Sequence, residues 1–209
     1  MNLKPIISLF LFLFITTEAL CQRVELIIDN KVYKSYVCTT YKVPLYVVYN
    51  LEDGGGDCDR KAYSFKDDPK CVLAQDSDYK YTGYDKGHLA NAEDFAFDCA
   101  KEKATFCYSN CVPQTTKLNR GIWKSWEYKV RELSHEEPLQ IICGGIYTNS
   151  TIGSGVHVPK YCYKIVKSRK TGKYMHVLLF TNTQKPTVKQ ITLDELKAKL
   201  GYQLIIPNT

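Results

Sequence analysis

The chain has 209 residues, enough for one domain with a buried core, and its 28 basic and 22 acidic residues give a net charge of +6. This basic excess is compatible with a polyanionic partner but does not establish one. The sequence contains no internal repeat, low-complexity tract or linker that would separate two domains. Beyond the first 21 residues, no segment is long and apolar enough to cross a membrane as a helix.

The first 21 residues have the pattern of a secretory signal peptide. Residues 6–15 form an apolar stretch that is too short to span a bilayer, because a helical span needs about 20 apolar residues. Cleavage is plausible after Cys21, and the alternative is a bacterial lipoprotein acylated at that cysteine, although Leu20 is larger than such signals prefer. We therefore expect residues 1–21 to be a signal peptide and 22–209 to form a single domain that is secreted to the extracellular space, or periplasmic if bacterial.

The cysteines agree with export. Removal of Cys21 with the leader leaves eight of the nine cysteines, and an even set in an exported chain indicates up to four disulfides of undetermined connectivity. A metal site is the weaker alternative, because no Cys-x-x-Cys pair occurs. The eight are Cys38, Cys58, Cys71, Cys99, Cys107, Cys111, Cys143 and Cys162.

Beta-branched and aromatic runs predict strands, and apolar residues at helical spacing predict helices. In chain order we expect strands at Val24–Ile28, Lys31–Val37 and Val43–Tyr49, a loop over Leu51–Lys80, a strand at Thr105–Ser109, a helix at Arg120–Leu133, strands at Leu139–Tyr147, Tyr161–Lys167 and Tyr174–Thr181, and a helix at Thr192–Leu200. Strands with a few inserted helices and no regular βαβ alternation indicate an α+β fold with a mixed, mainly antiparallel sheet.

An ordered series of short motifs occupies the middle of the chain. Asp85-Lys86-Gly87-His88 comes first, Ser109-Asn110-Cys111-Val112-Pro113-Gln114 follows, and Asn119-Arg120-Gly121-Ile122-Trp123 opens the predicted helix. The series resembles the DNA/RNA non-specific endonucleases of the ββα-metal (His-Me finger) type, whose signature is Asp-Arg-Gly-His, then Ser-Asn-x-x-Pro-Gln, then Asn-x-x-x-Trp. The resemblance extends roughly from Arg60 to the strand that begins at Tyr174, and it implies a ββα-metal motif within the α+β fold.

His88 is the candidate general base. Cleavage of a phosphodiester needs a nucleophilic water, and a histidine with an unperturbed pKa of about 6.5 is largely neutral at physiological pH and can take a proton from that water. Gly87 is expected to let the chain turn tightly before it. A lone histidine is more often structural, but its place in the ordered series favours catalysis.

Asn119 is the candidate metal ligand and Glu127 its partner on the helix. Magnesium prefers oxygen ligands and keeps several waters, so one amide oxygen suits a metal held mostly by water and substrate phosphate. Glu127 lies about 80° around the helix from Asn119 and is expected to hold a metal-bound water. The alternatives are a helix N-cap for Asn119 and a solvated surface position for Glu127.

The resemblance also assigns roles to residues outside this pair. Lys86 stands where the family usually has arginine; it keeps the positive charge beside the scissile phosphate but loses the bidentate guanidinium. Arg60 resembles a second phosphate-contacting arginine, although a plain surface arginine is an alternative. Asn110 and Gln114 are implied to orient the site.

Together these patterns predict a magnesium-dependent endonuclease, with Mn²⁺ as a possible substitute, that hydrolyses DNA and RNA without sequence specificity and leaves 5′-phosphate ends. One alternative is a catalytically weak or inactive nucleic-acid-binding protein on the same scaffold, which only Lys86 encourages. Another is a cysteine-rich structural module with no nucleic-acid role.

Overall fold

A computed structural model describes residues 23–207 and shows one large antiparallel sheet in the strand order β1-β2-β3-β6-β7-β8-β9. Its strands are β1 (Leu26–Asp29), β2 (Lys34–Cys38), β3 (Val43–Leu51), β6 (Leu139–Ile152), β7 (Val156–Ser168), β8 (Tyr174–Thr181) and β9 (Val188–Gln190). A separate two-stranded hairpin pairs β4 (Tyr84–His88) with β5 (Cys111–Thr115). The predicted α+β class with a mainly antiparallel sheet is confirmed.

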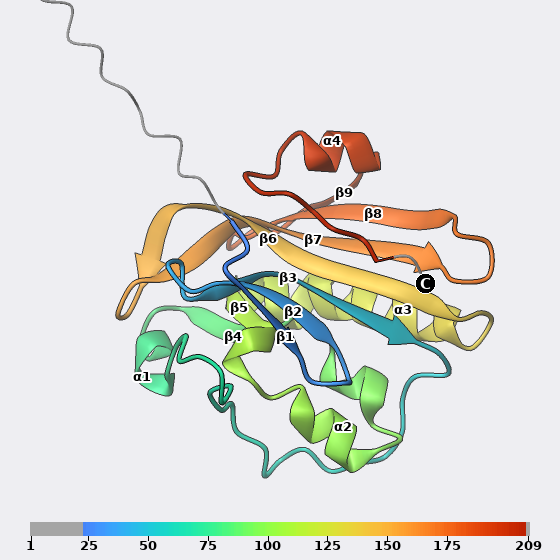
Figure 1. Ribbon diagram of the computed structural model, residues 1–209, viewed down its shortest axis with the longest axis horizontal. Helices are drawn as coiled ribbons and strands as arrows, with labels where there is room; N and C mark the ends of the chain where they lie inside the picture. The colour runs from blue at the N-terminus through green and yellow to red at the C-terminus, as the bar shows by residue number, and fades with distance from the viewer. Residues whose placement is uncertain (1–22, 208–209) are drawn as a thin grey trace, which may run out of the picture.

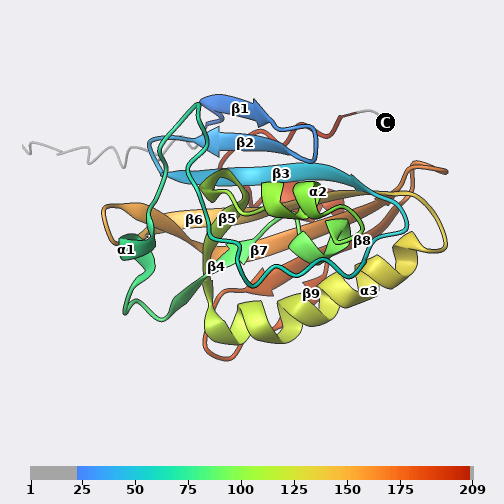
Figure 2. The ribbon, with the colours of Figure 1, turned by 90° about the horizontal axis from the view of Figure 1, so that it is seen from below.

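The helices are short except for one. They are α1 (Asp76–Tyr79), α2 (Cys99–Ala104), α3 (Lys124–Ser134) and α4 (Leu193–Lys197), with 3₁₀ turns η1 (Ala92–Phe95) and η2 (Tyr108–Asn110) and a π-helical segment η3 (Leu118–Trp123) that runs into α3. Figures 1 and 2 show α4 and the C-terminal segment on one face of the sheet, with α1, α2, α3 and the β4–β5 hairpin on the other.

The central strands β6 and β7 bury both faces, because each face is covered by one of these layers. Side chains alternate between the faces along a strand. On β7, Tyr163 bonds through its hydroxyl to that of Tyr202 in the C-terminal segment at 2.9 Å. The next residue, Lys164, lies beneath the sheet against Trp123 of η3, at 4.4 Å from the ring centroid. The sheet face that is covered by α3 and the β4–β5 pair therefore packs against η3, the segment that carries Asn119 and Trp123.

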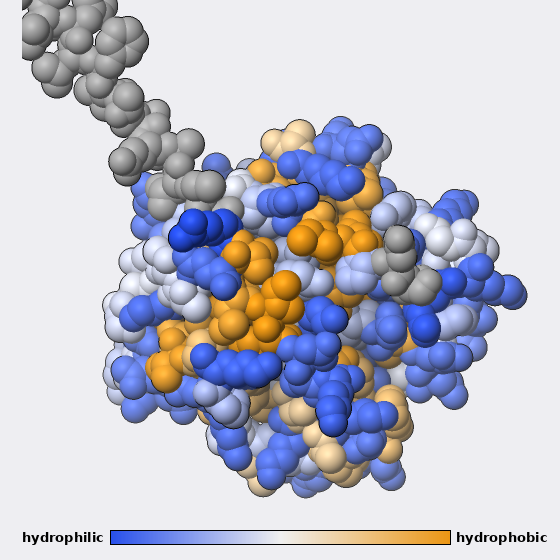
Figure 3. All heavy atoms as spheres, in the orientation of Figure 1, coloured by the Kyte–Doolittle hydropathy of each residue, from blue (hydrophilic) through white to orange (hydrophobic). Residues whose placement is uncertain are grey.

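The surface is mostly polar, with scattered apolar exceptions. Figure 3 shows apolar atoms gathered over part of the face that Figure 1 presents. Among the large apolar side chains, Ile27 and Ile205 are about half exposed, at 49% and 47%. No helix among residues 23–207 has the length and apolar character needed to cross a membrane.

Most predicted elements are present, but two segments differ: the loop expected over Leu51–Lys80 contains the one-turn helix α1, and the strand expected at residues 105–109 is absent. The segment Thr105–Ser109 does not form a strand, because Thr105 caps α2 and the chain then enters η2. The paired strand comes just afterwards as β5, and its partner β4 was not predicted as a strand. The last helix begins at Leu193 and is capped by Thr192 as expected. The side-chain oxygen of Thr192 accepts a hydrogen bond from Glu195 N at 3.1 Å.

Of the up to four disulfides expected, fewer form within residues 23–207. One bond is present, between Cys58 and Cys99. Six thiols are free: Cys38, Cys71, Cys107, Cys111, Cys143 and Cys162. Four of these six are buried and spread over separate strands, where they pack as small apolar side chains. The expected signal peptide and Cys21 lie outside the described residues.

Candidate active site

The β4–β5 hairpin and the helical segment after it bring the three motifs together. Pairing in register places His88 opposite Cys111 and Lys86 opposite Pro113, and η3 and α3 follow three residues after β5. Gly87 does not form the expected tight turn. It lies within β4, where a Cβ atom would stand 2.3 Å from Gln114 Oε1, so the close approach of the opposite strand is what requires glycine.

A cavity of about 590 Å³ opens beside this hairpin. Four of the predicted site residues reach it: His88, Arg60, Asn119 and Glu127. The remaining lining is Asn91, Glu93, Phe106, Arg120, Lys124, Tyr128 and Arg131, which gives the cavity an excess of positive charge. A concave site with basic walls fits a polyanionic substrate.

His88 faces the cavity with its ring packed against two aromatic side chains that also contact each other. The ring centroids of Phe65 and Phe106 each lie 4.7 Å from that of His88. Burial, with smaller contributions from the charges of Arg60 and Lys86, lowers the pKa of His88 to about 3. Its Nε2 has no hydrogen-bond partner among the described residues. The imidazole is therefore neutral at physiological pH and free to accept a proton.

Asn119 is fixed by Asp85, the first residue of the histidine motif. Its Nδ2 donates to Asp85 Oδ2 at 3.0 Å, and Arg120 binds the same carboxylate through two nitrogens at 2.9 Å each. Burial alone would raise the pKa of Asp85, but the hydrogen bonds from Arg120 and Asn119 lower it below its usual range. Because the amide nitrogen is committed to Asp85, the amide oxygen of Asn119 is the atom left to bind a ligand.

The N-cap alternative for Asn119 does not hold, because the helical segment begins one residue earlier and Lys117 occupies the cap. Within residues 23–207, no group of three His, Cys, Asp or Glu side chains is arranged to hold a metal ion. An amide oxygen on a half-buried wall is compatible with a hard cation that keeps most of its own water. The donor set thus fits magnesium better than zinc.

Glu127 lines the same cavity, one helical segment beyond Asn119. Burial raises its pKa to about 7, and the neighbouring charge of Lys164 is the largest effect opposing that rise. Arg131, one turn further along α3, binds the buried Asp94 at 3.1 Å. The helix therefore presents a carboxyl group whose protonation changes near neutral pH.

Arg60 and Lys86 differ in their relation to the cavity. Arg60 lines it and pairs with Glu93 at 3.5 Å, so its guanidinium is on the wall expected for a phosphate contact. Lys86 does not line it. Its Nζ forms an ion pair with Asp76 of α1, which also accepts a 2.7 Å hydrogen bond from the Tyr108 hydroxyl. In this arrangement Lys86 has to leave Asp76 before it can reach a substrate.

Asn110 is buried and cannot touch a substrate, so its expected place among the catalytic residues needs correction. Its Nδ2 donates to the carbonyl oxygens of Ala90 and Thr105, both at 2.9 Å, and its Oδ1 accepts from Ala90 N at 2.8 Å. It clasps the backbone just after His88. Gln114 is likewise buried, packed against Gly87, and both residues orient the site from within.

Three participants were not predicted as site residues. Asp85 and Arg120 stand inside the quoted motifs, but the sequence offers no sign that they bind each other. Lys164 lies in a strand pattern in which a lysine normally indicates an exposed position. The structure buries it, with only 1% of its surface exposed.

Residues 21–204 match the family model described as DNA/RNA non-specific endonuclease. The human mitochondrial nuclease EXOG is 31% identical over 149 residues, which are 62% of this chain and 40% of EXOG. A nuclease of Nostoc sp. is 38% identical over 100 residues, which cover 46% of this chain and 35% of the cyanobacterial protein. This chain thus spans well under half the length of these relatives.

Among solved structures, the crystal structure of the EndoG/EndoGI complex contains a chain with a TM-score of 0.73 and 23% identity. The match covers 83% of this chain and 82% of that one, and it supports the ββα-metal fold. The human relatives, EXOG and endonuclease G, are mitochondrial nucleases, which overturns the expectation that this protein is secreted. With a family model that covers nearly its whole length, the chain belongs to the DNA/RNA non-specific endonuclease family.

Proposed function

We propose that this protein is a magnesium-dependent endonuclease that hydrolyses DNA and RNA without sequence specificity and leaves 5′-phosphate ends. One observation carries the proposal: His88 and Asn119 line one basic cavity, with the imidazole neutral and the amide oxygen uncommitted. Family membership supports nuclease activity, and the choice of metal rests on the donor set.

His88 accepts the proton of the attacking water, and the aromatic rings beside it keep its orientation. Asn119 holds the metal through its amide oxygen, with Asp85 fixing the rotamer. When bound, the metal supplies positive charge that stabilises the phosphoryl oxygens and the departing 3′-oxygen. Mn²⁺ is the expected substitute, because it also prefers oxygen ligands.

Glu127 and Arg60 both line the cavity. Glu127 would accept hydrogen bonds from water in the metal site, and Arg60 would exchange Glu93 for a substrate phosphate. Lys86 contributes once it has left Asp76. All these contacts are to phosphate and water, which makes cleavage insensitive to base sequence.

The test is digestion of supercoiled plasmid and of a structured RNA by the purified protein, with Mg²⁺, with Mn²⁺ and with EDTA. We expect cleavage of both substrates in either metal, none with EDTA, and ends that a ligase can join without phosphorylation. Cleavage that persists in EDTA would contradict the metal assignment.

The second candidate is a nucleic-acid-binding protein without turnover. The ion pair between Lys86 and Asp76 favours it, because it holds a predicted catalytic cation away from the cavity. Such a protein would bind single-stranded DNA with a steep salt dependence and cut nothing. The same digestion, with binding measured in parallel by fluorescence anisotropy, separates the two candidates.

A further inference from the structure

Lys164 on β7 is buried within the core beneath the active site. Its side chain is 1% exposed, and its Nζ lies 4.4 Å from the Trp123 ring centroid and 3.1 Å from Cys143 Sγ. A buried ammonium group is costly unless an opposite charge compensates it. Among residues 23–207, no carboxylate lies within ion-pair distance of this nitrogen, so the compensating charge acts from slightly further away.

Cys143 cannot supply that charge, because burial raises the pKa of its thiol and keeps it neutral. The carboxylates that act on Lys164 are Glu127 and Asp94. Asp94 is already matched, since it binds Arg131 at 3.1 Å and accepts from the Tyr49 hydroxyl at 2.8 Å. Glu127 is in no ion pair among residues 23–207, and contact with the Trp123 side chain only lowers its pKa, so its charge is the one left for Lys164.

The Trp123 indole links Lys164 to the helix that carries Glu127. Its ring carries the Lys164 ammonium on one face, and it also contacts Phe180 of β8 edge to face, with centroids 5.0 Å apart. Trp123 immediately precedes α3, so the same indole fixes the start of the helix on which Glu127 stands. Lys164, Trp123 and Glu127 thus form a continuous path from the core to the cavity wall.

We infer that Lys164 is a positioning residue: its buried ammonium group balances the charge of Glu127 from beneath and holds that carboxylate toward the cavity. Lys164 does not line the cavity itself, so it acts on the reaction only through Glu127. The inference rests on the proposed function for its catalytic consequence but not for the charge pairing.

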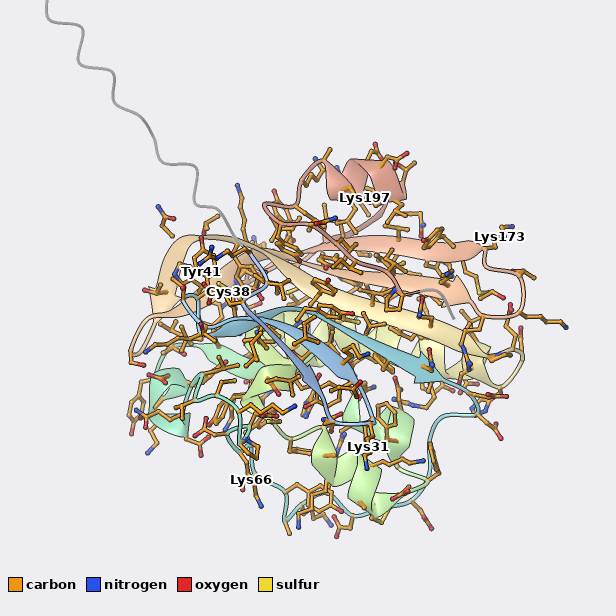
Figure 4. All side chains as sticks on the ribbon, in the orientation of Figure 1. Lys31, Cys38, Tyr41, Lys66, Lys173 and Lys197 are labelled. Carbon is orange, nitrogen blue, oxygen red and sulfur yellow. A yellow bond between two sulfur atoms is a disulfide. The ribbon has the colours of Figure 1, made fainter. Side chains whose placement is uncertain are left out.

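The experiment is a double-mutant cycle with Lys164→Met, Glu127→Gln and their combination. Since residues that support a metal site are typically worth 10- to 100-fold, we expect Lys164→Met to lower kcat by about that factor with little change in KM. In the Glu127→Gln background, Lys164→Met should lower kcat by less than twofold. Lys173→Met is the matched control, because Lys173 is exposed at the β7–β8 turn (Figure 4) and should leave kcat unchanged. Equal losses in both backgrounds would overturn the inference.

A second cycle uses urea unfolding and requires no activity. The midpoint should fall when Lys164→Met leaves Glu127 uncompensated, and it should fall less when Glu127→Gln is already present. If Lys164→Met does not fold alone, recovery of folding with Glu127→Gln supports the pairing, and failure in both backgrounds refutes it. A wild-type protein without nuclease activity would defeat the proposed function while this cycle still decides the pairing.

Discussion

At the scale of single residues, the cavity is organised by which polar atoms are already bonded. Asp85 takes the amide nitrogen of Asn119 and two nitrogens of Arg120, and thereby leaves one oxygen of Asn119 free. Both the amide oxygen and the amide nitrogen of Asn110 are hydrogen-bonded to backbone groups of Ala90 and Thr105. We propose that the chemistry takes place between the neutral imidazole of His88 and the amide oxygen of Asn119 that Asp85 leaves free.

Replacement of His88 by alanine should lower kcat by about 10²- to 10⁴-fold, the usual contribution of a positioned acid–base group. The fold should survive, because the ring is held by packing rather than by hydrogen bonds. Steady-state kinetics together with a melting curve test this. A variant that keeps more than a tenth of wild-type turnover would show that His88 is not the base.

Replacement of Asp85 by asparagine should lower activity by about 10- to 100-fold, because it removes the group that orients Asn119, the proposed metal ligand. Asp76→Asn is the matched control: this aspartate holds Lys86 rather than Asn119. Freeing Lys86 should leave turnover unchanged or raise it. Loss of activity in the control but not in Asp85→Asn would reverse these assignments.

The pH dependence should reflect Glu127 rather than His88. The pKa of His88 is lowered to about 3, so its proton is absent across the working range, whereas the pKa of Glu127 is raised to about 7. Activity that needs the ionised carboxylate is lost as pH falls through that value. We expect kcat to rise between pH 6 and 8, and Glu127→Gln to remove this limb while lowering the plateau; an unchanged limb in that variant would assign it to another group.

At the scale of elements, the β4–β5 hairpin depends on contact between its two strands. A methyl group at Gly87 would collide with Gln114, so Gly87→Ala should lower the free energy of unfolding by about 1–3 kcal/mol, the usual effect of overpacking. Addition of Gln114→Ser makes room and should recover part of that loss. Urea unfolding of the single and double variants tests this, and no recovery would mean that backbone strain is responsible.

The sequence predicts these elements unevenly. The motif order was enough to predict that His88, Asn119 and Glu127 share one cavity, because β4 pairs with β5 and the helical segment follows β5 directly. The prediction of a strand at Thr105–Ser109 was wrong because Phe106 packs against His88 and Tyr108 belongs to the 3₁₀ turn η2. The ion pair of Lys86 with Asp76 and the burial of Lys164 depend on contacts between distant segments, which periodicity does not encode.

At the scale of the whole molecule, residues 23–207 contain one disulfide and six thiols where up to four disulfides were expected. Cys58–Cys99 ties the loop that carries Arg60 to α2 across a separation of 41 residues. Its loss through Cys58→Ser should cost about 2–4 kcal/mol of unfolding free energy. In unfolded, unreduced protein that begins at residue 22, thiol titration should find six free thiols. Detection of no free thiol would instead support the four-disulfide framework.

The central claim is that Asn119 and His88 form one metal-dependent hydrolytic site. Its most direct test is the kcat of wild-type and Asn119→Ala protein on plasmid DNA across a series of Mg²⁺ concentrations. The account predicts saturation by Mg²⁺ in the wild type, and in the variant a turnover lower by at least 10²-fold that high Mg²⁺ restores only in part. Equal turnover with the same Mg²⁺ dependence in both proteins would show that the metal binds elsewhere and contradict the claim.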